Sequence, residues 1–172
     1  MSGRGLTSAL NLVLIGMPGC GKSTIGLAAS RIMGRAFVDL DEEIEREAGM
    51  SIPDIFRREG EDAFRELEHA AAERAGRGEA LVIASGGGTV KRADSMDELR
   101  RNGAAIWLTR PLALLAIDGR PLSTDMDALR RLEAERTPLY EKYAAARVSN
   151  AESIESAVRR AAKAFYEIAA RG

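Results

Sequence analysis

The sequence predicts an α/β protein with a parallel sheet that helices cover on both faces. Short apolar runs, such as those at 11–15, 80–84 and 104–108, alternate with helix-compatible segments along the whole chain. This order suits parallel strands, because each strand reaches the next through a crossover helix. Continuous apolar runs are typical of strands that are buried on both faces. No repeat or linker divides the 172 residues, so we expect 1–172 to form a single domain.

In the first half of the chain, glycine, serine and proline mark the predicted element ends. Gly34 and Gly49 suit helix C-caps, while Ser51 and Pro53 suit a helix start. Gly60 is expected to interrupt the helix that begins at Ser51 and Pro53. The predicted elements are a strand at 11–15, a helix ending near 33, a strand at 36–41, and helices at 42–48, 52–59 and 61–75.

The second half continues the alternation. An apolar strand at 80–84 is followed by a serine and three glycines, and a second apolar strand is expected at 104–108. The stretch 110–124 lacks a clear period and contains Gly119-Arg120-Pro121, so we interpret it as a loop or lid. We expect Thr137-Pro138 to interrupt a helix that begins near 125. The other predicted elements are a helix at 93–101, a short strand around Val148 and a helix at 151–170.

A glycine-rich loop follows the first strand. Residues 16–23 match the pattern G-x-x-x-x-G-K-[ST] between a β-type run and a helix, which is the context of a phosphate-binding P-loop. Its glycines let successive backbone N–H groups point at phosphate oxygens, and the next helix adds the positive end of its dipole. Lys22 can reach the outer phosphates, and the Ser23 hydroxyl can bind Mg²⁺. The alternative is a chance match in a glycine-rich turn.

The composition excludes several classes of protein. A net charge of −1 gives no general attraction to nucleic acid or anionic membranes. Cys20 is the single cysteine, so an internal disulfide framework is excluded. The apolar run at 11–15 is too short for a signal peptide or a membrane span. We therefore expect a cytoplasmic monomer that uses ATP and binds neither nucleic acid nor a membrane.

Two acids and three glycines stand at predicted strand ends. Asp39 and Asp41 would face the same side if the second strand continued through both of them. One could hold Mg²⁺ through water, and the other could accept a hydrogen bond from a substrate hydroxyl. Alternatively, both merely cap the helix at 42–48. The glycines at 86–88 suit a place where a ligand touches the main chain, although a simple turn would also use glycine.

Three arginines become informative only as part of a longer series of motifs. Alone, Arg65, Arg120 and Arg136 would each be an ordinary surface residue. The series runs from the P-loop through Asp39-x-Asp41, Phe64-Arg65, the glycines at 86–88 and Arg120-Pro121-Leu122 to Arg136-x-Pro138-Leu139-Tyr140. With these motifs in order over about residues 11–150, the sequence resembles the shikimate kinase family.

The resemblance implies a fold and an activity. The family has a three-layer P-loop kinase fold, like that of nucleoside monophosphate kinases, with a five-stranded parallel sheet. It uses MgATP to phosphorylate the 3-hydroxyl of shikimate, on the route to chorismate and the aromatic amino acids. In this chain a substrate-binding segment is expected at about 34–62 and a lid at about 110–125.

The resemblance also implies the roles of residues on the nucleotide side. Mg²⁺ is expected to bind Ser23 directly and Asp39 through water. Lys22 and the lid residue Arg120 are expected to act as catalytic cations on the phosphates. The residues expected to bind the ATP phosphates are Gly19, Cys20, Gly21, Lys22, Ser23, Thr24 and Arg120.

On the acceptor side, Asp41 is expected to hold substrate hydroxyls and to orient or deprotonate the attacking one. Arg65 and Arg136 would grip the carboxylate of shikimate, for which planar guanidinium groups are well suited. Gly87 would offer its backbone N–H to the substrate.

The adenine side departs from the family pattern. Relatives often carry an arginine that stacks on adenine several residues before the lid Arg-Pro, but none occurs at 111–119. Asn150 is the candidate for an adenine contact, by its location near the last strand.

Two other kinds of function share part of this pattern. A kinase acting on gluconate or a nucleoside monophosphate would have the P-loop, but it need not contain the Arg65 and Arg136 pair with the three glycines. A regulatory nucleotide-binding module without turnover would have no need to keep all of the residues Lys22, Ser23, Asp39, Asp41 and Arg120. A panel of acceptors with ATP separates these alternatives.

Overall fold

The computed structural model of the protein describes residues 8–115 and 126–172, which contain one five-stranded sheet. All neighbouring strands are parallel, and their order is β2-β3-β1-β4-β5. The strands are β1 (Asn11–Ile15), β2 (Ala36–Asp39), β3 (Leu81–Ala84), β4 (Gly103–Thr109) and β5 (Ala146–Ser149). The predicted α/β class, with a parallel sheet, is confirmed.

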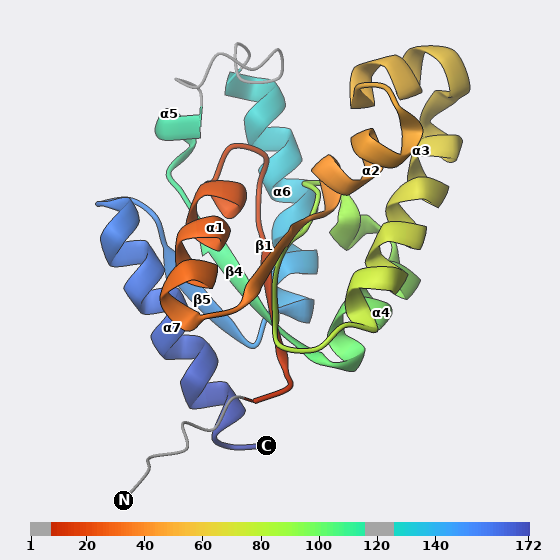
Figure 1. Ribbon diagram of the computed structural model, residues 1–172. Helices are drawn as coiled ribbons and strands as arrows, with labels where there is room; N and C mark the ends of the chain where they lie inside the picture. The colour runs from red at the N-terminus through yellow and green to blue at the C-terminus, as the bar shows by residue number, and fades with distance from the viewer. Residues whose placement is uncertain (1–7, 116–125) are drawn as a thin grey trace, which may run out of the picture.

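Helices cover both faces of the sheet (Figure 1). Helices α1 (Lys22–Met33) and α7 (Ile154–Ala169) pack together on one face, and α4 (Ala93–Arg101) and α6 (Met126–Tyr143) pack on the other. Helix α2 (Leu40–Ala48) packs on α3 (Ile52–Gly76), which in turn packs on α4. The short helices α5 (Leu112–Leu115) and η1 (Thr89–Lys91) complete the described elements. The predicted three-layer arrangement is confirmed.

The central strand β1 is buried along its whole length, and its one polar residue is fully paired. The Asn11 side-chain amide donates to the carbonyl of Gly78 at 2.8 Å, and its oxygen accepts from the N–H of Leu81 at 2.8 Å. A buried amide would destabilise the core without such partners. Asn11 therefore ties the start of β1 to the segment that enters β3.

The carboxyl ends of the strands meet at one edge of the sheet, because all five strands run the same way. The P-loop leaves β1, the three glycines leave β3 and Asp39 ends β2. In open α/β sheets the crevice outside these ends, where the strand order reverses, is the usual ligand site. The topology thus brings three motifs that are far apart in sequence to the same crevice.

The prediction that β2 continues through Asp41 is wrong. The strand ends at Asp39, whose carboxylate accepts hydrogen bonds from the N–H groups of Asp41 and Glu42 and caps α2. Free N–H groups at a helix start favour such a cap over continued strand pairing. Asp41 therefore lies in the first turn of α2, and its direction follows the helix rather than strand alternation.

The predicted break at Pro138 is also wrong, because α6 runs through it. Proline removes one backbone hydrogen bond within a helix. Buried residues of α6 on both sides of it, Leu129 and Tyr140, hold the helix against the protein. The break predicted at Gly60 is confirmed, since its φ of 87° is not helical and kinks α3.

None of the helices in the described part of the chain combines the length and the apolarity needed to cross a membrane.

Candidate active site

The P-loop curls around its own lysine. The Lys22 ammonium is buried and donates to the carbonyls of Gly16 at 2.8 Å and Met17 at 3.0 Å. Gly16 has φ +155°, and a Cβ there would lie 2.5 Å from the carbonyl oxygen of Leu108. Only glycine fits so closely against β4 in this conformation. The close approach brings Lys22 to the start of α1, where the helix dipole favours anions.

Asn150, the residue after β5, supports the P-loop. Its side-chain amide nitrogen donates to the carbonyl of Cys20 at 2.9 Å, and its backbone N–H donates to Thr109 at 2.7 Å. Cys20 is itself fully buried. Asn150 is the sequence candidate for an adenine contact. In the structure its amide nitrogen is bonded to the P-loop instead. An adjoining cavity of about 380 Å³ includes Thr24, Ile25 and Leu114 in its lining.

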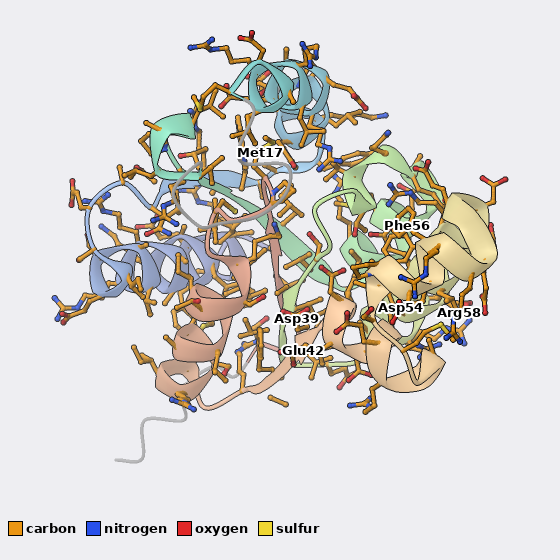
Figure 2. The ribbon with its side chains drawn as sticks, turned by 90° about the horizontal axis from the view of Figure 1, so that it is seen from above. Met17, Asp39, Glu42, Asp54, Phe56 and Arg58 are labelled. Atoms are coloured by element: carbon orange, nitrogen blue, oxygen red, sulfur yellow. The ribbon has the colours of Figure 1, made fainter. Side chains whose placement is uncertain are left out.

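A second cavity, of about 360 Å³, lies at the carboxyl edge of the sheet. The predicted acceptor and phosphate residues meet in it. Seen from above (Figure 2), Asp39 lies between α1 and α2. Neither Asp39 nor Cys20 lines the cavity, and Arg120 lies outside the described residues. The predicted site residues that line it are Gly19, Gly21, Lys22, Ser23, Thr24, Asp41, Arg65, Gly87 and Arg136.

Asp39 divides its two oxygens between two tasks. One oxygen accepts the capping N–H groups of α2, and the other accepts a hydrogen bond from the Ser23 hydroxyl. A hydroxyl and a carboxylate oxygen beside the P-loop match the oxygen donors that Mg²⁺ prefers. The donor set therefore fits a magnesium ion next to the nucleotide phosphates.

Asp41 sits in an environment that disfavours its charge. Burial, followed by the neighbouring charge of Asp39, raises the pKa of Asp41 from 3.8 to about 6, while Lys22 acts in the opposite direction. Glu68 and Glu45 add to the rise. Asp41 is therefore ionised at neutral pH, but it can take up a proton far more readily than an ordinary aspartate.

We predict that Asp41→Asn stabilises the fold at neutral pH. Because the folded pKa is raised, Asp41 favours folding while protonated, and that stability is lost as pH rises through about 6. Asparagine carries no charge, so the variant does not lose unfolding free energy as pH rises through this range. Its gain in unfolding free energy should be about 1 kcal/mol larger near pH 7.5 than near pH 5, a difference that denaturant titrations at the two pH values measure. A gain that is equal at both values would contradict the prediction.

The glycines at 86–88 approach three sets of side chains. A Cβ on Gly86 would lie 2.6 Å from a carboxylate oxygen of Glu68 and 2.9 Å from one of Asp41. On Gly87 it would lie 2.7 Å from Pro18, and on Gly88 it would lie 2.6 Å from the Arg65 guanidinium. A side chain at any of the three positions would displace these groups from their present places. The loop is thus the shared wall against which the acceptor residues and the P-loop pack.

The two arginines expected to grip a carboxylate reach the cavity from different helices. Arg136, on α6, donates from Nη1 to the Gly87 carbonyl at 2.6 Å, and its Nε is buried with no hydrogen-bond partner among the described residues. Arg65, on α3, pairs with Glu68 at 3.0 Å and with Glu61 at 3.2 Å. A buried guanidinium N–H without a partner is costly, and a bound carboxylate would satisfy it.

Several residues that contact this site were not predicted from the sequence. Glu68 is almost fully buried and binds both Arg65 and the hydroxyl of Thr89, the latter at 2.8 Å. The hydroxyl of Ser85 lines the cavity, is buried and has no partner among the described residues. The only hint in the sequence was that Arg65 and Glu68 lie three residues apart on a predicted helix, a spacing that allows an ion pair.

The predicted lid falls largely outside the described residues, which end at 115 and resume at 126. Arg110, at its start, lines the main cavity and donates to the carbonyl of Gly19 at 3.2 Å.

Comparisons with known proteins agree on one family. The shikimate kinase family model matches residues 18–167. A curated shikimate kinase from Symbiobacterium thermophilum is 37% identical over 95% of this chain and 100% of its own length. The solved structure of a shikimate kinase from Acinetobacter baumannii in complex with shikimate covers 96% of each chain at 32% identity, with a TM-score of 0.85.

A gluconokinase from Sinorhizobium meliloti also has a similar structure. It aligns over 95% of each chain with a TM-score of 0.64, at 23% identity. At that identity the likeness concerns the fold alone, so it gives no support to gluconate as the acceptor.

Proposed function

The chain belongs to the shikimate kinase family, so it transfers the terminal phosphoryl group of ATP to shikimate, and we propose how its own residues perform this reaction. The product is shikimate 3-phosphate, on the route to chorismate and the aromatic amino acids. The observation that most supports our assignment of residues is that Arg136, with its unpartnered buried Nε, lines the same cavity as Lys22. A carboxylate and a phosphate can thus bind in one cavity.

We propose direct in-line transfer, in which the protein supplies position and charge rather than a covalent intermediate. The P-loop backbone and Lys22 hold the phosphates. Ser23 and Asp39 would hold Mg²⁺, which would supply positive charge to the phosphate oxygens. Asp41 accepts a hydrogen bond from the attacking hydroxyl and takes its proton, a role that suits a pKa of about 6.

Arg65 and Arg136 bind the carboxylate of shikimate from two sides of the cavity. The buried Nε of Arg136 is a donor for one carboxylate oxygen, and Arg65 is held in place by Glu68. Gly87 lines the same wall and provides a backbone contact to the substrate. The roles proposed for Gly19, Cys20, Gly21 and Thr24 are contacts to the ATP phosphates, and that for Arg120 is a contact from the lid.

We predict that Asp39→Asn weakens magnesium dependence without unfolding α2. Asparagine still offers an oxygen to the capping N–H groups, but it replaces the oxygen beside Ser23 with an uncharged amide. The Mg²⁺ concentration for half-maximal activity should rise about tenfold. Asp39→Ala, which also removes the cap, should in addition lose about 1 kcal/mol of stability. An unchanged Mg²⁺ requirement in Asp39→Asn would argue against this metal site.

A coupled assay of ADP release, with shikimate present and absent, tests the assignment of activity. The expected result is ADP release that depends on shikimate, with an equal amount of phosphorylated product detected by mass spectrometry. Gluconate, AMP and CMP serve as alternative acceptors. Turnover with one of these alone would indicate a different kinase, and ATP binding without any product would indicate a regulatory module.

We further propose that 1–172 is one kinase domain, with 34–62 as the substrate-binding segment and 110–125 as the lid. Since all the residues assigned above come from one chain, we propose that the enzyme acts as a monomer. A cytoplasmic location suits an enzyme that consumes ATP.

A further inference from the structure

A stack of side chains lies behind the wall that the glycines at 86–88 form. Tyr140 on α6 is almost fully buried, and its ring stacks on Trp107 of β4 with the centroids 5.5 Å apart and the planes 26° apart. The guanidinium of Arg147, on β5, lies 4.5 Å from the centroid of the Trp107 ring. The stack therefore fixes the Tyr140 ring from the side of the sheet.

The Tyr140 hydroxyl points at the residues that face the substrate. It lies 3.4 Å from the carbonyl oxygen of Gly87, a long hydrogen bond in which the hydroxyl donates. The same carbonyl accepts Nη1 of Arg136 at 2.6 Å. Arg136 and Tyr140 lie four residues apart, one helical turn, so both reach one carbonyl from one face of α6.

The hydroxyl remains a donor throughout the working range of an enzyme. Burial raises the pKa of Tyr140 to about 12, although the neighbouring Arg136 opposes the rise. A neutral hydroxyl can donate to the Gly87 carbonyl, which also accepts from Arg136. The shared carbonyl therefore links Tyr140, the guanidinium and the glycine loop.

We propose that Tyr140 is a positioning residue for the acceptor site, which orients Arg136 and the Gly87 loop toward the carboxylate of the substrate without touching it. This inference rests on the proposed function, because it assigns the carboxylate to Arg136. Tyr140 limits the freedom of both the guanidinium and the loop before the substrate arrives. Orienting a binding group in advance lowers the entropy that binding must otherwise remove.

The test compares Tyr140→Phe with Tyr143→Phe. Both changes remove a single hydroxyl from a buried ring on α6, but Tyr143 lines a different cavity at the other end of β4. Tyr140→Phe should raise KM for shikimate about fivefold, because the guanidinium and the loop are less well oriented, with KM for ATP unchanged. Loss of the bond to Gly87 should also lower Tm by a few degrees, about 1 kcal/mol of stability. Tyr143→Phe should leave both KM values unchanged. Equal shifts in both KM values, or the same shift in Tyr143→Phe, would overturn the proposal.

Two further readouts separate positioning from packing. Trp107 is the single tryptophan of the chain and stacks on Tyr140. Its fluorescence, titrated with shikimate in the absence of ATP, should show about the same fivefold rise in Kd. In an Arg136→Lys background, Tyr140→Phe should change KM less than twofold, since residues that act through one another are not additive. A full fivefold effect in that background would overturn the proposed route through Arg136.

The same experiments distinguish failure of this inference from failure of the proposed function. If the unmodified protein did not phosphorylate shikimate, the assignment of activity would fail. If the unmodified protein phosphorylated shikimate, and Tyr140→Phe had the same KM and Kd for shikimate, only the positioning role would fail.

Discussion

Replacing Lys22 with alanine should lower kcat for shikimate phosphorylation about 1,000-fold and leave the fold intact. The Lys22 ammonium is buried in the P-loop beside the start of α1, where its charge is shielded little by water. Preorganised cations at the transferring phosphoryl group stabilise the charge that develops there, and one such group is worth about 10²–10³ in rate. Steady-state kinetics at saturating ATP and shikimate measure the loss.

The fold should survive because alanine leaves no buried charge without a partner. The carbonyls of Gly16 and Met17 each lose one hydrogen bond, at a cost of about 1 kcal/mol apiece. Circular dichroism and thermal unfolding check this. Lys163→Ala, which removes an exposed lysine from α7, is the matched control and should keep full activity. Turnover of Lys22→Ala near that of the unmodified enzyme would refute the role of the lysine.

Replacing Arg136 with alanine should raise KM for shikimate about 100-fold and KM for ATP less than twofold. Loss of one partner from a buried, hydrogen-bonded charge pair costs about 2–5 kcal/mol, and each 1.4 kcal/mol is tenfold. ATP is expected to contact the P-loop and Lys22, whereas Arg136 donates to the carbonyl of Gly87. Substrate saturation curves, each with the other substrate in excess, measure both values.

The identity of the cation should matter as well as its charge. Arg136→Lys should recover only part of the affinity, because a lysine offers a point charge in place of two parallel N–H groups. Arg130→Ala, which removes an exposed arginine from the same helix, should have no effect on either KM. Equal increases of both KM values in Arg136→Ala would argue against a carboxylate clamp.

Local chemistry made the P-loop and many element boundaries predictable. The strand at 11–15 appears as predicted, and Gly34 and Gly49 end their helices in the left-handed conformation. These features depend on residues within a few positions of one another, so a single sequence reveals them. The order of the motifs then indicated which strand ends would meet.

Features that depend on distant partners could not be predicted in the same way. Strand alternation predicted that Asp41 faces the same side as Asp39. The strand ends at Asp39 instead, because Asp39 caps α2. Proline chemistry predicted a break at Pro138, but tertiary packing carries α6 through it. Glu68 is a surface-type residue by its chemistry, and only folding reveals its burial against Thr89.

The loop at 86–88 also limits how this chain can diverge over evolutionary time. A methyl group at each of its positions would collide with a different neighbour, so no one compensating substitution could admit side chains at all three. Gly34 and Gly49 carry no such restriction, because they have open space where a Cβ would stand and asparagine tolerates their backbone conformation. Substitutions should therefore accumulate at these two positions, while the loop remains invariant.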